Sequence, residues 1–214
     1  MTIVSTANNT DVDNSSALVA EFAGGASSDV SMMIGIGLVK DTDAVFFQYV
    51  GNEQTPQALM LPSGKPLTRL QNVRLVGCTI ADEIGEFKST KLNLFLESSQ
   101  GRVVMLTSGL TTIWSQCVLT GLMGLFEQRS MDDSFTLDSW KGTSKMRPCF
   151  AAIKVNNQRR SSDEMYQSLT DARADRDNAK VSTILRDAVD CLDAAVRETT
   201  AVDAVDVKIE EPAF

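Results

Sequence analysis

Between residues 29 and 160 the hydrophobic side chains recur with two different periods. Five short stretches alternate polar and apolar residues or form apolar runs bounded by turn residues, which predicts β-strands. These stretches are 72–81, 91–97, 101–107, 134–140 and 149–155. Residues 111–126 instead carry large apolar side chains at helical spacing, so we predict a helix between the third and fourth strands.

Alternation within a strand predicts which side chains face the core, because residues two apart share a face. The core row of the second strand is predicted to consist of Leu92, Leu94 and Leu96. By the same rule Phe135 and Leu137 point inward in the fourth strand. The opposite face then carries one aromatic ring on each of three strands, namely Phe95, Trp140 and Phe150.

The two ends of the chain differ from this middle part. Residues 1–28 are rich in small and polar residues, so we expect a disordered acidic arm. Apolar runs at 30–39, 44–50 and 58–62, with polar residues 51–57 between the last two, predict a hairpin that precedes the main strands. A helical segment is predicted over 161–200, with Ser161 as N-cap and Glu164 completing a capping box. Its apolar stripe, between residues 181 and 196, is expected to dock on its own domain or on a second copy.

The predicted order is strand, strand, strand, helix, strand, strand, which resembles that of the OB-fold, a small five-stranded barrel used widely for oligonucleotides. We therefore expect a mainly β protein with helices. Its centre would be an OB-like nucleic-acid-binding domain over 29–160, including the N-terminal hairpin extension, followed by the helical segment and an acidic tail over 201–214. Other α+β domains share this order of elements.

Charge is unevenly distributed along the chain, whose formal net charge is -8. Residues 61–160 hold thirteen basic and eight acidic side chains, whereas acidic residues predominate on both sides of them. The stretch 140–160 contains six basic residues and no acidic one. Such a block is typical of polyanion binders, because lysine and arginine displace the counterions condensed on phosphates. A solvated loop with scattered lysines is the alternative.

Aromatic rings and cations together are what single-stranded nucleic acid requires, since bases stack on rings while phosphates need positive charge. The residues that we predict to contact the strand are Lys91, Phe95, Trp140, Lys141, Lys145, Arg147, Phe150 and Lys154. The alternative for any one ring is that it packs under the N-terminal hairpin or against a partner subunit. No helix-turn-helix pattern or zinc finger indicates a reader of duplex DNA.

Several function classes are disfavoured by what the chain lacks. It contains no histidine, which removes Ser-His and Cys-His nucleophile pairs and His-containing zinc sites. Its four cysteines form no CxxC pair, so we expect reduced thiols in a cytoplasmic protein. Acidic groups at 82–86 and 132–133 match no Mg²⁺ or Ca²⁺ loop. We therefore expect no enzyme activity, no cofactor and no metal. The uncharged run 103–126 is interrupted by hydroxyl side chains, which argues against a membrane helix.

The chain ends with two carboxylates, a proline and a terminal phenylalanine. This ending is similar to the C-terminal tip of bacterial and phage single-stranded DNA-binding proteins, which docks on replication and repair proteins. The resemblance implies that Glu210, Glu211, Pro212 and Phe214 bind such partners, and that the protein coats and protects single-stranded DNA as a homo-oligomer. The alternative is a non-catalytic oligomeric structural or assembly protein of phage or plasmid origin, whose exposed aromatic residues are subunit contacts.

Overall fold

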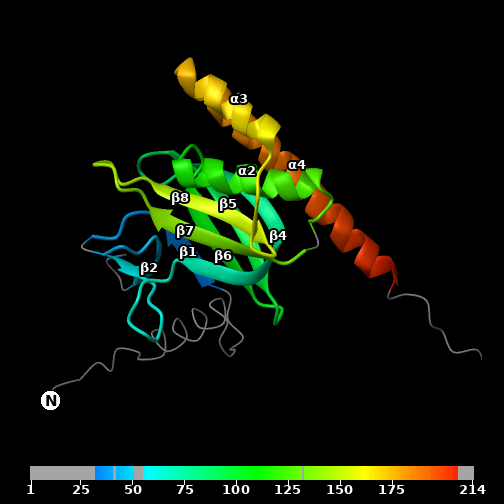
Figure 1. The fold of residues 1–214 in the computed structure, drawn as a ribbon, viewed down its shortest axis with the longest axis horizontal. Coiled ribbons are helices and arrows are strands. Elements are labelled where there is room, and N and C mark those ends of the chain that lie inside the picture. Colours follow the sequence, from blue (N-terminus) through cyan, green and yellow to red (C-terminus); the bar gives the residue numbers. More distant parts are fainter. Residues whose placement is uncertain (1–31, 41, 51–54, 132, 207–214) are drawn as a thin grey trace, which may run out of the picture.

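A single β-sheet with helices on one side forms the part of the protein that the structure describes (Figure 1). This computed structural model describes residues 32–40, 42–50, 55–131 and 133–206, and side chains as far as residue 199. Within these ranges nine strands pair in the order β3-β2-β1-β6-β5-β4-β7-β8-β9. All neighbouring strands are antiparallel except β1 and β6, which are parallel.

The strands differ greatly in length. The first three are short: β1 (Met32–Ile36), β2 (Phe46–Val50) and β3 (Thr55–Ala58). The centre of the sheet is formed by β4 (Arg69–Ile84), β5 (Ser89–Ser98) and β6 (Val103–Gly109). The other edge consists of β7 (Phe135–Lys141), β8 (Cys149–Val155) and β9 (Gln158–Arg160). The five predicted strands are thus present, whereas β3 and β9 were not predicted.

The expectation of a mainly β protein with an OB-like barrel is wrong, because the described residues form a mixed α/β fold whose sheet is open. The five predicted strands lie side by side as β6-β5-β4-β7-β8, so a closed barrel would require β6 to pair with β8. Both edges that would close the barrel are already occupied. The predicted N-terminal hairpin forms as β1 and β2, and its first strand pairs with β6, while β9 pairs with β8. The hairpin is therefore part of the same sheet.

One face of the sheet is buried beneath helix α2 (Ile113–Glu127) and helix α4 (Asn178–Asp206). The predicted row Leu92, Leu94 and Leu96 is buried in this core, as are Phe135 and Leu137. Alternation predicted this face correctly because β5 has one buried and one half-exposed side throughout.

Helix α2 is anchored to the sheet by a hydrogen bond and by close packing. The buried Trp114 donates its indole N–H to Ser139 Oγ on β7 over 3.0 Å. Gly121 lets the helix approach β8, since a Cβ there would lie 2.6 Å from Cγ1 of Ile153. The sequence predicted the helix at 111–126, close to its observed bounds.

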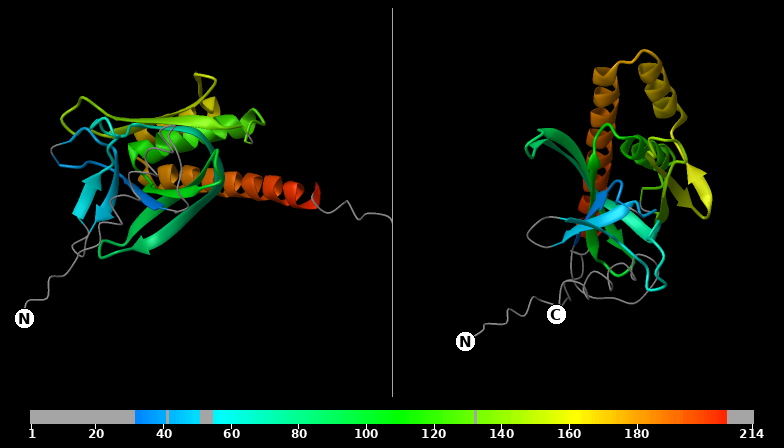
Figure 2. Two further views of the ribbon diagram at one scale, coloured as in Figure 1. Left: turned by 90° about the horizontal axis from the view of Figure 1, so that it is seen from below. Right: turned by 90° about the vertical axis from the view of Figure 1, so that its left-hand side faces the viewer.

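Two further helices follow β9 and pack against α2 (Figures 1 and 2). Helix α3 (Asp163–Ala174) begins one residue later than expected, because the Oγ of Ser162, and not that of Ser161, accepts the hydrogen bond from Met165 N. The predicted stripe of α4 is largely buried against β4, α2 and α3, so it docks on its own domain.

Helix α4 continues six residues beyond the predicted end at 200, and its C-terminal end extends past the strands (Figure 1). Within the described residues, no helix is both long enough and apolar enough to cross a membrane. The predicted acidic arm 1–28 lies outside the described residues, and so do the last eight residues, which include the predicted docking tip.

Candidate nucleic-acid interface on the open sheet face

The face of the sheet opposite the buried leucines carries the candidate site, and we call it the open face. The described helices all lie on the other side of the sheet (Figure 2). Cross-strand pairing shows which residues share the open face, because directly opposed residues point the same way. Phe95 pairs with Gly77 and Met105, while Asp138 pairs with Arg69 and Ala152.

Two of the three predicted aromatic residues meet on this face. Trp140 on β7 and Phe150 on β8 are directly opposed in the ladder. Their ring centroids lie 5.9 Å apart with an angle of 18° between the planes, which is a stacked arrangement. Trp140 is 43% exposed and Phe150 is partly buried, so it is mainly the Trp140 ring that is presented to solvent.

A cluster of charged side chains adjoins the aromatic pair. Asp138 lies two residues before Trp140 on the same strand face, and it is bound by two cations. Its Oδ1 is 2.5 Å from Nε of Arg69, and its Oδ2 is 2.6 Å from Nζ of Lys154. Partial burial by itself would raise the pKa of Asp138, but the hydrogen bonds from Arg69 and Lys154 outweigh it and the pKa is lowered. The cluster therefore carries one net positive charge next to the rings.

Phe95 and Lys91 do not join this cluster. Phe95 pairs with Gly77, and Lys91 pairs with Ala81, on the distal half of β4. Trp140 instead lies beside the start of β4, since the neighbouring Ser139 N–H donates to the carbonyl of Thr68. At about 3.3 Å per residue, the distance along the strand from residue 68 to Gly77 is roughly 30 Å.

Phe95 belongs to a second apolar row on the open face. Its ring covers Gly77, and a Cβ at that glycine would lie 3.1 Å from the ring. Met105 on β6 is opposed to Phe95, and Met33 on β1 is opposed to Met105. Met33 is 49% exposed, so this row reaches solvent at β1.

The predicted basic residues around the β7–β8 loop have different partners. Lys141 Nζ donates to the carbonyl oxygen of Thr42 over 2.6 Å, and Arg147 forms an ion pair of 2.6 Å with Asp43. Both cations therefore fix the loop to the segment before β2. Lys145 forms no hydrogen bond or ion pair with the described residues, and neither does Lys91.

Several residues of the open face were missed from the sequence. Arg69 and Arg74 lie at the beginning of β4, and Arg74 is 2.5 Å from the Oε2 of Glu97 on β5. Met33 and Met105 look like core residues by composition. The alternation around Leu94 and Leu106 would have placed Met105 on the open face. Met33 could not be placed in this way, because its position depends on the parallel pairing of β1 with β6.

The acidic groups and the thiols of the described residues have partners or environments of their own. No group of three or more potential metal-binding Asp, Glu or Cys side chains comes together in the part of the chain that the structure describes. Asp82 is bound by Arg186 on α4 at 2.5 Å, and the hydrogen bonds from Arg186 and then Thr90 lower its pKa. All four cysteines are free thiols, and burial raises the pKa of Cys78 strongly.

Comparison with protein-family models, with curated proteins and with solved structures gives no match. The open face and its residues are therefore interpreted from their own geometry.

Proposed function

We propose that this protein binds single-stranded DNA across the open face of its sheet and protects it during replication or recombination. The observation that carries the proposal is the exposed ring of Trp140, stacked on the partly buried Phe150 and lying beside the cations Arg69 and Lys154. A base can stack on the exposed ring, and the adjoining phosphate then lies near positive charge. Each stacked base is worth about 1–3 kcal/mol in proteins of this kind.

The length of the open face supports a path for several nucleotides. The aromatic pair and Phe95 are separated by roughly 30 Å along the strands, with charged side chains between and beside them. Lys145 and Lys91, which form no ion pair with described residues, would supply cations near the two ends. Nothing in this arrangement reads base edges, so binding should tolerate most sequences.

The proposal extends to cellular context. Four free thiols suit the reducing cytoplasm. Glu210, Glu211, Pro212 and Phe214, which lie outside the described residues, would recruit replication or repair proteins, as the resemblance of the chain's ending implies. No cofactor or catalytic step is part of this function.

A non-catalytic assembly protein is the second candidate, and the apolar row favours it. Met33 and Tyr49, both about half exposed, lie toward the β1–β2 side of the sheet, where a second copy could cover them. Several cations of the open face are also paired with Asp138 or Glu97, which reduces the net charge of this face, as an interface between subunits favours.

The test is fluorescence anisotropy of a labelled oligo-dT titrated with the protein at low and high salt. Trp140→Ala should weaken binding about 5- to 150-fold, which corresponds to the loss of one stacked base. The matched control is Tyr166→Ala, which removes an aromatic ring that is 59% exposed on α3, on the opposite side of the protein. The control should bind as the unmodified protein does.

A second variant tests the role of the charge cluster. Asp138→Asn should strengthen binding and steepen its salt dependence, because it releases Arg69 and Lys154 for phosphate. Weak binding by the full chain should be rechecked after removal of residues 207–214, whose two glutamates can compete for the open face. Absence of binding in both forms, together with self-association in light scattering, would refute the proposal and favour the assembly protein.

A further inference from the structure

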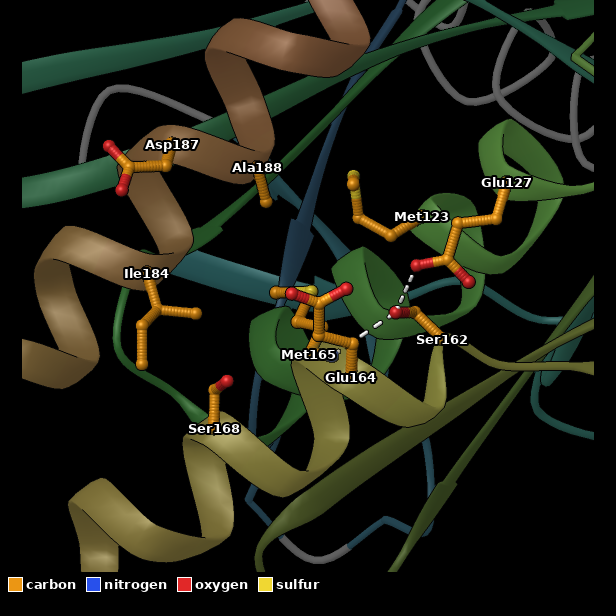
Figure 3. A pocket seen from close by; sticks show the side chains of 9 residues that line it. All are labelled: Met123, Glu127, Ser162, Glu164, Met165, Ser168, Ile184, Asp187 and Ala188. Carbon is orange, nitrogen blue, oxygen red and sulfur yellow. Dashed lines mark hydrogen bonds between the residues drawn. The ribbon is translucent and has the colours of Figure 1, made fainter.

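A pocket between the three helices lies on the side of the protein away from the open face (Figure 3). It has a volume of about 280 Å³ and is formed where α3 and α4 leave a gap beside the end of α2. Its lining residues are Met123, Glu127, Ser162, Glu164, Met165, Ser168, Ile184, Asp187 and Ala188. The proposed binding of single-stranded DNA does not use this pocket.

The walls of the pocket are apolar, whereas its rim is acidic. Met123, Met165 and Ala188 come from three different helices and line its interior. Glu127 and Glu164 both lie near Ser162 at the pocket, and the carboxylate of Glu127 is turned toward the Ser162 hydroxyl (Figure 3). The pocket therefore combines apolar lining residues with acidic ones.

The rim carboxylates have no cationic partner among the described residues. Glu127 accepts a hydrogen bond from the hydroxyl of Ser162, which is neutral. Neither Glu164 nor Asp187 forms a hydrogen bond or ion pair with a described side chain, although both lie on helices that carry arginines. Because all three side chains are exposed and pair with no described cation, they are accessible to a cation from another molecule.

We propose that this pocket docks a basic amphipathic helix of a partner protein, which inserts a lysine or arginine side chain. The aliphatic stem of such a side chain packs against Met123 and Met165 while its charged head lies between Glu127 and Glu164. The volume exceeds that of one side chain, so a neighbouring apolar residue of the same helix fits beside it. The rest of the partner helix would lie against the surface of α3 and α4 beside the pocket.

The chain's own ends have the wrong charge for this pocket. Residues 1–31 contain four acidic residues and no lysine or arginine. Residues 207–214 contain one lysine against two glutamates and the terminal carboxylate. Charge complementarity thus favours a separate, basic partner.

The test uses a fluorescein-labelled amphipathic peptide of about 14 leucines and lysines, titrated against the full chain and followed by anisotropy. The pocket variant Glu164→Gln/Asp187→Asn should bind this peptide about tenfold more weakly, because it removes two charged acceptors. The matched control Glu86→Gln/Asp133→Asn removes two exposed carboxylates that do not line the pocket, and should bind as the unmodified chain does. Thermal melts establish that both variants are folded.

Two altered peptides test the two halves of the pocket. A peptide with acetylated lysines tests the acidic rim, and one with serine in place of leucine tests the apolar walls, so both should bind weakly. Equal losses in the pocket and control variants would show only general charge attraction and would overturn the proposal. Absence of peptide binding, or self-association of the chain that only the pocket variant abolishes, would overturn it as well.

Discussion

Replacing Gly124 by alanine should destabilise the protein, although alanine is the better helix former. Gly124 is buried on α2 where this helix passes the backbone between β9 and α3. A Cβ at this position would lie 2.6 Å from both the N and C atoms of Ser161 and 2.8 Å from its O atom. Carbon contacts normally begin at about 3.5 Å, so the backbone would have to move by nearly 1 Å.

The backbone at Ser161 has little freedom to make that movement. The next residue, Ser162, donates its N–H to the carbonyl of Thr120 over 2.9 Å and also caps α3. A change from glycine to alanine gains about 1 kcal/mol in an unhindered helix, whereas overpacking costs about 1–3 kcal/mol or more. Because the opposing atoms are backbone, we expect a net loss of about 2 kcal/mol, or about 4–8 °C in melting temperature.

Urea unfolding followed by circular dichroism measures this loss. Gly121→Ala is the informative comparison, because its new methyl group would lie 2.6 Å from Cγ1 and 2.9 Å from Cβ of Ile153, and 3.5 Å from the backbone oxygen of Arg160, which is an ordinary contact distance. It should cost less than Gly124→Ala, since Cγ1 of Ile153 can rotate away and only a small shift at its Cβ remains, whereas Gly124 faces three backbone atoms of Ser161. A gain in stability for Gly124→Ala, or a change within a few tenths of a kcal/mol, would refute this explanation of the glycine.

Three further predictions test the core, the charge cluster and the thiols. Leu94→Ala should lower the free energy of unfolding by about 2–5 kcal/mol, measured by urea unfolding, and a smaller loss would show that the sheet collapses around the cavity. The lowered pKa of Asp138 stabilises the fold above the ordinary carboxyl pKa, and this contribution is lost as pH falls through the lowered value. In acid titrations the stability difference between the unmodified protein and Asp138→Asn should therefore be full at neutral pH and shrink below about pH 4; a constant difference would contradict the assignment. Cys78, which is buried with a raised pKa, should resist alkylation in the native protein while the half-buried Cys191 reacts faster, and equal rates in a mass-spectrometric time course would contradict this order.

Local patterns were sufficient to predict the elements and the buried side of the central strands. The alternation around Leu94 and the helical spacing around Val118 both correspond to buried faces. These signals are reliable because they depend only on the period of the chain and on which residues avoid water. The stacking partners Trp140 and Phe150 were predicted to share a face, but their contact required the register of β7 with β8.

The closure of the sheet could not be predicted in this way. The order of elements is compatible with a barrel, and what prevents it is the pairing of β1 with β6 and of β9 with β8. Both pairings depend on which strand occupies each free edge of the sheet, and the alternation of residues within one strand carries no information about this. The same holds for the tight fit of Gly124 against Ser161, which depends on the path of the chain after β9.

By itself the amino-acid sequence determined which residue types occur along the chain: a basic middle with aromatic residues, acidic ends, and no histidine. Only the tertiary structure decided how these residues are distributed. It brought Arg69, Asp138 and Lys154 together across three strands and left Phe95 about 30 Å along the sheet from Trp140. The physical reason is that charge and polarity belong to single residues, whereas contacts between distant residues depend on strand order and register.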